Sequence, residues 1–277
     1  MSKFKFQIKP KVQDFKIMGI LNVTLDSFSD GGKFFNVAKA LQRAKQMIKE
    51  GADIIDVGGE SSGPGSKFVT VEEELRRVIP VIKKLAPVAK KRKILISVDT
   101  YKAEVARQAI LAGARIVNDV TALRGDPKMA EVIADSGVKI TLMYSKDSSA
   151  RTTRKKKRYK DVVKTVMRFL EERIDFALKS GIKRSQIIID PGMGMFLSAI
   201  PKYSFEILRR LAEFKRLGFP ILIGASRKSF LPGTINERLG STLIAHLVAV
   251  QNGAEIIRVH DVKEHKIMAE ASRFPSY

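Results

Sequence analysis

Residues 94–119, ILISVDTYKAEVARQAILAGARIVND, contain one structural repeat of the chain. The run Ile94–Asp99 is apolar, rich in β-branched residues and closed by an aspartate, which is typical of a strand buried on both faces. The stretch Ala103–Leu111 has the apolar spacing of an amphipathic helix, and Gly113 after it accepts the left-handed turn that ends many helices. Residues 115–119 begin the next strand, so the stretch predicts a β-α-β unit with parallel strands.

The same unit repeats along the chain. The strand-like runs are Lys16–Val23, Asp53–Val57, Ile94–Asp99, Arg115–Asp119, Lys139–Met143, Gln186–Asp190, Pro220–Gly224 and Glu255–His260. Helical patterns between them include Ala38–Glu50, Val71–Leu85, Ala103–Leu111, Val162–Ser180, Ser204–Leu217 and Ser241–Asn252. Eight repeats favour a closed (β/α)8 TIM barrel of the α/β class over an open sheet, and such a barrel needs about 250 residues. With no linker in sight, we predict a single domain over residues 1–277, in which residues 1–14 are an N-terminal extension.

Composition limits the partners. Lys and Arg total 51 against 29 Asp and Glu, a formal charge of +22 that attracts polyanions. No zinc finger or aromatic RNA-binding strand accompanies this charge, so we expect an enzyme with an anionic substrate and no nucleic-acid partner. No apolar run approaches the roughly 20 residues of a membrane span, and the first residues lack a secretory apolar core. Because the chain also has no cysteine, we expect a cytoplasmic protein without disulfides or membrane contact.

Polar side chains gather at the carboxyl ends of the predicted strands. They are Asn22, Asp26, Ser27, Asp30, Asp56, Glu60, Asp99, Asn118, Asp119, Asp190, Ser226, Arg227, Lys228, Arg258, His260 and Asp261. In a barrel this end carries the active site, because the loops that follow the strands converge there. A single Asp or Asn could equally cap the next helix, but caps do not require Arg, Lys and His.

Seven sequence blocks carry a family resemblance. They are GILNVTLDSFSDGGKF (19–34), DIIDVGGESSGPGS (53–66), ISVDTYK (96–102), IVNDVTAL (116–123), IIIDPGMG (187–194), ILIGASRKSF (221–230) and RVHDV (258–262). In order and spacing they resemble the successive motifs of the dihydropteroate synthases. The resemblance implies an alkyl (pterin-methyl) transferase of folate biosynthesis. Its substrates are 6-hydroxymethyl-7,8-dihydropterin diphosphate and para-aminobenzoate, and its products are 7,8-dihydropteroate and pyrophosphate.

The resemblance also implies roles for the pterin-diphosphate site. Asp99, Asn118 and Asp190 match the residues that read the pterin edge, and directional hydrogen bonds of this kind favour one ring over its analogues. Lys228 lies beside the pterin carbonyl, and Ser229 follows it in the substrate-binding set. Arg258 and His260 anchor the diphosphate together with Asn22. We take Asp99, Lys228, Arg258 and His260 as the catalytic set.

The expected cofactor is Mg2+, which prefers oxygen ligands and substrate phosphates. The resemblance gives Asn22 as its protein ligand, assisted by Asp30 or Asp26. It also implies an SN1-like reaction in which the C–O bond breaks first and the arylamine then attacks a pterin methylene cation. A neutral aromatic amine is already nucleophilic, so no strong general base is needed.

Aminobenzoate is expected to bind at Ser62, Gly63, Pro64, Met195 and Phe196, and the chain departs from the family at all of these except Pro64. Gly63 replaces the usual arginine, residues 194–197 read GMFL where the family usually has Gly-Phe-Gly-Lys, and Leu25 replaces a proline. The stretch DPGMGMFLS (190–198), with Pro201 three residues on, is similar to a divergent branch that includes sulfonamide-insensitive synthases. We therefore predict reduced sulfonamide sensitivity.

Several features of the sequence allow two interpretations each. The loops Thr24–Phe34 and Gly58–Ser66 are either mobile lids over the site or plain surface loops. The basic run Arg151–Lys160 is either a solvated loop or a surface that steers the diphosphate. Met143 either lines the pterin floor or belongs to the core. We expect His246 to be packed or partly exposed at the edge of the core and His265 to be solvated.

Two rival functions stay open. A methyltetrahydrofolate methyltransferase-like barrel would share the pterin-reading carboxylates but would not need the cations at 226–228 and 258–260. A non-catalytic pterin-binding paralogue would explain the loss of the arginine at position 63. The resemblance further suggests a homodimer packed through the late helices.

Overall fold

The computed structural model describes residues 14–24 and 37–272. Within them, strands and helices alternate along the chain. The strands are β1 (Lys16–Asn22), β2 (Ile54–Gly58), β3 (Leu95–Asp99), β4 (Ile116–Asp119), β5 (Lys139–Met143), β6 (Ile187–Asp190), β7 (Leu222–Ile223) and β8 (Ile256–Val259). The helices are α2 (Val37–Glu50), α3 (Val71–Arg92), α4 (Ala103–Ala112), α5 (Met129–Ser136), α6 (Val162–Lys179), α7 (Lys202–Arg209), α8 (Leu239–Gln251) and α9 (Val262–Ala271).

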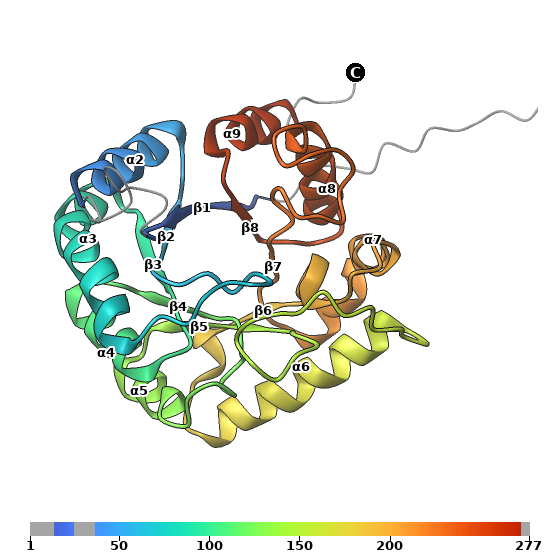
Figure 1. The fold of residues 1–277 in the computed structure, drawn as a ribbon, viewed down its shortest axis with the longest axis horizontal. Coiled ribbons are helices and arrows are strands. Elements are labelled where there is room, and N and C mark those ends of the chain that lie inside the picture. The colour runs from blue at the N-terminus through green and yellow to red at the C-terminus, as the bar shows by residue number, and fades with distance from the viewer. Residues whose placement is uncertain (1–13, 25–36, 273–277) are drawn as a thin grey trace, which may run out of the picture.

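The strands form one parallel sheet that curls into a barrel inside a ring of helices (Figure 1). Its order is β6-β5-β4-β3-β2-β1-β8-β7. Strands that are consecutive in sequence are therefore neighbours in the sheet, except β6 and β7, which form its two edges, and the first strand, β1, pairs with the last, β8. A parallel bridge between Ile189 and Ile221 joins the two edges, and the Ile189 amide donates to the Pro220 carbonyl over 2.9 Å. The predicted single-domain (β/α)8 barrel is confirmed.

Side chains alternate along each strand, and those that point into the barrel are apolar at one end and polar at the other. Every second residue points into the barrel. Near the amino ends of the strands these inward residues form a small apolar cluster of Met18, Ile54, Ile116, Ile188, Leu222 and Ile256. Two or four residues later the same face carries Asn22, Asp56, Asn118, Asp190 and Arg258. The barrel is therefore plugged by hydrocarbon at one end and lined by polar side chains at the other.

The helix boundaries differ from expectation in two places. The predicted helix 204–217 is divided into α7 and a 3-10 segment, Leu211–Leu217. The helix predicted to end at Leu85 continues to Arg92 although Pro80 and Pro87 lie inside it. Its ends favour this length, because Thr70 caps the first turn and Lys90, Lys91 and Arg92 occupy the last, where cations interact well with the helix dipole. None of the helices in the described ranges is long and apolar enough to cross a membrane.

Candidate active site

A cavity of about 590 Å3 opens at the carboxyl end of the barrel strands. Its wall includes all eight residues predicted to bind the pterin diphosphate: Asn22, Asp99, Asn118, Asp190, Lys228, Ser229, Arg258 and His260. Ser62, Gly63, Pro64 and Phe196 from the predicted aminobenzoate pocket also line it, as does Met143, whereas Met195 does not. Leu25, Asp26 and Asp30 lie outside the described residues, and so does most of the first predicted lid.

At the wall of the cavity a guanidinium is held between two carboxylates. Arg258 Nε donates to Asp56 Oδ2 over 2.6 Å, and its Nη2 donates to Asp99 Oδ2 over 2.7 Å. Asn118 Nδ2 also donates to Asp56 Oδ2, over 3.2 Å. Burial raises the pKa of Asp99, and the positive charge of Arg258 opposes that shift. We had assigned no role to Asp56, although it follows the same strand-end pattern as Asp99.

Asp190 and Lys228 also line the cavity, and each favours the charged form of the other. Asp190 Oδ1 accepts from the Gly192 amide over 2.7 Å. Gly192 has φ +72°, and a Cβ there would lie 2.3 Å from the Tyr144 carbonyl oxygen, so this turn requires glycine. Burial raises the pKa of Asp190, while Lys228 opposes the rise.

Lys228 reaches across the loop that follows β6. Its Nζ donates to the Met193 carbonyl over 3.2 Å and lies 5.0 Å from the centroid of the Phe196 ring. Burial lowers the pKa of Lys228 to about 8, although Asp190 favours the charged form. At neutral pH the site therefore keeps an ammonium group that is nevertheless close to losing its proton.

His260 is held as a neutral imidazole. Its Nδ1 lies 2.9 Å from Ser226 Oγ, and that oxygen also accepts from the His260 amide over 3.2 Å. With the amide donating to Oγ, the serine hydroxyl donates to Nδ1 and the ring proton is assigned to Nε2. Burial, then the charges of Arg258 and Arg227, lower the pKa of His260 to about 4. The ring thus offers an N–H donor at neutral pH.

A histidine pair supports this wall from behind. The Ala225 amide donates to His246 Nε2 over 3.0 Å, His246 Nδ1 lies 2.8 Å from His265 Nε2, and His265 Nδ1 lies 2.6 Å from the Asp261 carbonyl oxygen. His246 is packed, as predicted, but the prediction that His265 is solvated is wrong because its side chain is fully buried. Its partners lie on α8 and at the end of β8, contacts that its place in the sequence does not reveal.

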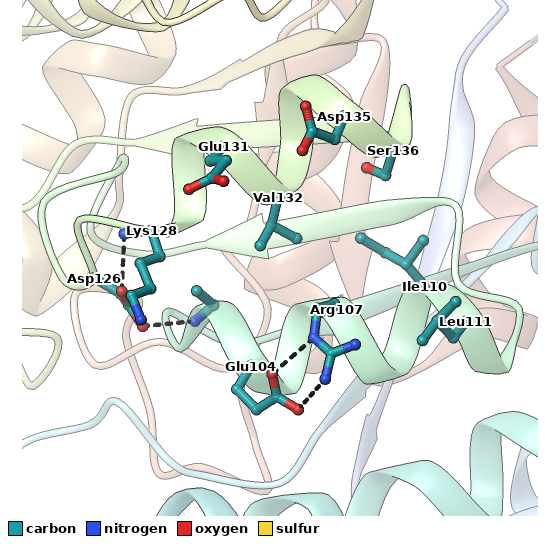
Figure 2. Close-up of a pocket in the computed structure, with 11 residues that line it drawn as sticks. Glu104, Arg107, Ile110, Leu111, Asp126, Lys128, Glu131, Val132, Asp135 and Ser136 are labelled. Carbon is teal, nitrogen blue, oxygen red and sulfur yellow. Dashed lines mark hydrogen bonds and ion pairs between the residues drawn. The ribbon is translucent and has the colours of Figure 1, made fainter.

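A larger hollow, of about 710 Å3, lies outside the barrel between α4 and α5 (Figure 2). Its charges serve local structure. Glu104 bonds both Nε and Nη2 of Arg107, and Asp126 accepts from the amides of Ala103 and Lys128. Because the eight residues predicted to bind the pterin diphosphate all line the smaller cavity, we place the chemistry there.

Comparisons with known proteins agree with this placement. A family model described as "Pterin binding enzyme" matches residues 18–260. The dihydropteroate synthase of Bacillus subtilis is 41% identical over 270 residues, covering 95% of this chain and 90% of that protein. The dihydropteroate synthase of Escherichia coli K12 is 43% identical over 252 residues, covering 90% and 87%.

Solved structures are similar over the same length. The Xanthomonas albilineans dihydropteroate synthase with 4-aminobenzoic acid has a TM-score of 0.85 and 41% identity, covering 94% of this chain and 92% of that one. The Clostridium difficile enzyme in the presence of pteroic acid has a TM-score of 0.85 and 43% identity, covering 96% and 98%. The chain therefore belongs to the pterin-binding enzyme family and, within it, to the dihydropteroate synthases.

Proposed function

We infer that this chain is a transferase that condenses 6-hydroxymethyl-7,8-dihydropterin diphosphate with para-aminobenzoate, forming 7,8-dihydropteroate and pyrophosphate. One observation supports the inference most directly. The cavity of about 590 Å3 gathers carboxylates, two side-chain amides, cations and a neutral imidazole from six different strand ends. A methyltransferase-like barrel has no need for a wall that combines the cations Lys228 and Arg258 with the imidazole of His260.

The pterin half of the substrate binds against the buried carboxylates. Asp99 and Asp190 accept hydrogen bonds from the amino-pyrimidinone edge, and Asn118 can donate and accept beside them. Charge-assisted hydrogen bonds of this kind are short and directional. Lys228 lies within reach of Asp190 and holds the ring carbonyl.

The diphosphate binds at the side of β8 and β1. Arg258 donates from Nε to Asp56 and from Nη2 to Asp99, so the other N–H groups of its planar guanidinium remain for phosphate oxygens. His260 Nε2–H is a neutral donor for the same group, and Asn22 lines the cavity at the end of β1.

Asn22 is also the residue that would hold Mg2+. Its side chain is exposed to the cavity, and it makes no side-chain hydrogen bond within residues 14–24 and 37–272. One amide oxygen plus diphosphate oxygens is a suitable donor set for this ion, which is usually bound through few protein ligands. When bound, Mg2+ would neutralise charge on the departing pyrophosphate.

The protein's part in the reaction is to hold charge, not to remove a proton. His260, with a pKa of about 4, remains neutral near pH 7 and donates to the leaving group. The arylamine needs no base, so the buried carboxylates serve to orient the pterin while its C–O bond breaks. Preorganised donors at the departing charge are usually the largest contribution to catalysis.

The finer features of this function are also proposals. The altered residues Ser62, Gly63, Met195 and Phe196 reshape the wall around aminobenzoate and reduce sulfonamide sensitivity. Potent competitive inhibition of the purified enzyme by sulfamethoxazole would contradict this. We further propose a cytoplasmic homodimer packed through the late helices, which sedimentation would test.

Pyrophosphate release from the pterin diphosphate, with and without para-aminobenzoate, tests the function. Release that depends on the amine is the expected result. Binding of the pterin diphosphate without turnover would favour the non-catalytic paralogue. The variant Asp190→Asn, which keeps the side-chain volume but removes the charge, should lose most of the turnover.

A further inference from the structure

Two histidines outside the cavity join the two strand ends that carry its diphosphate side. His246 lies on α8 and His265 on α9, which are neighbours in the ring of helices (Figure 1). Ala225 follows β7, and Asp261 follows β8. The hydrogen bonds that run from the Ala225 amide through His246 and His265 to the Asp261 carbonyl form what we call the histidine chain. Both rings are fully buried, and neither lines the cavity.

The backbone groups at the two ends of the histidine chain determine where its protons lie. The Ala225 amide can only donate, so His246 Nε2 is an acceptor and the ring proton lies on Nδ1. The Asp261 carbonyl can only accept, so His265 carries its proton on Nδ1 and none on Nε2. These assignments, made from opposite ends, agree at the central bond, where His246 Nδ1–H donates to His265 Nε2 over 2.8 Å. The chain is therefore complete only when both rings are neutral, and burial favours that state because it lowers the pKa of each.

Helix α8 holds the backbone on both sides of Ser226. His246 accepts from the Ala225 amide, and Thr242 Oγ1 accepts from the Arg227 amide over 3.2 Å. Thr242 and His246 are four residues apart and so lie on one face of the helix. Arg227 has φ +56°, a left-handed conformation that is unfavourable for a residue with a side chain and persists where the surroundings enforce it. The backbone around Ser226 is thus imposed by α8.

Ser226 in turn orients the imidazole of His260. Its hydroxyl donates to Nδ1 over 2.9 Å, and the same oxygen accepts from the His260 amide over 3.2 Å. These bonds leave Nε2–H as the donor that the ring can offer to a ligand in the cavity. A parallel link lies beside them, because Arg227 Nε donates to Asp261 Oδ2 over 3.0 Å. The histidine chain, the serine and this ion pair together join the segments that follow β7 and β8.

We propose that His246 is a positioning residue for the diphosphate side of the cavity. It sets the backbone that carries Ser226, and the serine sets the Nε2–H group of His260 that donates to the leaving group. His265 fixes the tautomer of His246 by accepting its Nδ1–H. The proposal rests on the proposed function, because it assumes that a diphosphate binds at His260. Since neither buried histidine touches substrate, loss of the chain should weaken diphosphate binding and spare the pterin ring.

The proton positions can be measured directly. The chain has three histidines, so NMR of untagged protein with isotope-labelled histidine can resolve every ring, and single variants assign them. At neutral pH we expect the proton on Nδ1 in His246 and His265 and on Nε2 in His260. A proton on Nε2 of either buried ring would contradict the histidine chain and with it the proposal.

The functional test compares two ligands by calorimetry at one fixed Mg2+ concentration. They are inorganic pyrophosphate and 6-hydroxymethyl-7,8-dihydropterin, which lacks the diphosphate. For His246→Leu we expect the Kd of pyrophosphate to rise about tenfold, as for one misaligned hydrogen bond to a charged group. The Kd of the pterin alcohol should change less than about twofold, because the pterin-reading residues keep their contacts. His246→Gln should recover most of the loss, since its Oε1 can accept from the Ala225 amide in place of Nε2.

Val250→Ala is the matched control for a simple loss of stability. Val250 is buried on the same helix and takes part in none of these hydrogen bonds. The control should unfold at a lower urea concentration, while both dissociation constants keep their wild-type values. If His246→Leu fails to fold, His265→Leu breaks the chain at its other ring and should show the same selective loss.

Three results would overturn the positioning role. They are unchanged pyrophosphate binding in both leucine variants, equal weakening of the two ligands, and a glutamine variant no better than the leucine variant. A wild-type enzyme without amine-dependent pyrophosphate release would instead contradict the proposed function, whatever the variants show.

Discussion

Replacing Arg258 with methionine tests whether the buried ion cluster holds the barrel mouth together. The change keeps much of the hydrocarbon stem and removes the guanidinium that contacts Asp56 over 2.6 Å and Asp99 over 2.7 Å. Asp56 is fully buried, and its Oδ1 already has no hydrogen-bond partner in the described chain. Without Arg258, the carboxylate of Asp56 stays buried and loses its positively charged partner.

The expected cost follows from that burial. Removing one partner of a buried pair destabilises a protein by about 3–5 kcal/mol, because the other charge stays buried. A barrel of this size loses roughly 2–4 °C of melting temperature per kcal/mol, so we expect a decrease of roughly 6–20 °C. Asp99 faces the cavity, where water can replace the lost guanidinium, so Asp56 should account for most of the lost stability.

The cost should also depend on pH. Loss of Arg258 raises the pKa of Asp99 further above its unfolded value, so the folded variant holds a proton that the unfolded chain has released. A raised folded pKa stabilises below the unfolded pKa, and this contribution is lost as pH rises through the folded pKa. The variant should therefore be closer to wild type at pH 5 than at pH 8.

Urea unfolding of wild type and variant at both pH values measures the effect. Arg107→Met is the matched control, since Arg107 contacts Glu104 over 2.7 Å but both side chains are about half exposed. Exposed pairs contribute little, so this variant should melt near the wild-type temperature. If Arg258→Met costs no more than the control, or equally at both pH values, the buried-charge reasoning is refuted.

Three further outcomes follow from the site. Burial lowers the pKa of Lys228 to about 8, so its ammonium group loses its proton above that pH. The KM of the wild-type enzyme for the pterin diphosphate should therefore rise above pH 8. Lys228→Met should show no such rise when initial rates are measured across the same pH range. His246→Leu leaves the Ala225 amide and His265 Nε2 buried without partners, so urea unfolding should show a loss of about 2–4 kcal/mol, and a loss below about 1 kcal/mol would argue against the histidine chain. Asn22→Ala should raise the Mg2+ concentration needed for half-maximal rate by about tenfold or more, whereas an unchanged Mg2+ titration would remove Asn22 from the metal site.

Periodicity made much of the fold predictable. The β-α repeat, the eight strand runs and the polar strand ends are local patterns, and parallel strands in a barrel bring their carboxyl ends to one rim. This is why Asn22, Asp99, Asn118, Asp190 and Arg258 can be grouped from the sequence, and why they all line one cavity. The motifs then indicated the chemistry.

Contacts between distant loops were less predictable. Arg258 looked like a phosphate anchor, yet its nearest partners are Asp56 and Asp99, residues 202 and 159 positions away. His265, several residues after the last strand, is predicted to be solvated, but it is buried and hydrogen-bonded to His246. Such pairings depend on how neighbouring elements pack, and spacing along one element does not reveal them.

The basic run, residues 151–160, shows what the sequence alone determines and what the tertiary structure adds. By itself the sequence determined that residues 151–160 are polar, strongly charged and placed after a strand end, because composition and local pattern are properties of the segment alone. The tertiary structure decided that Arg154 faces solvent while Arg151 faces Glu60, with Thr152 bonded to the neighbouring loop. The physical reason is that burial of a side chain is set by the surfaces folded against it, which here come from the loops after β2 and β6.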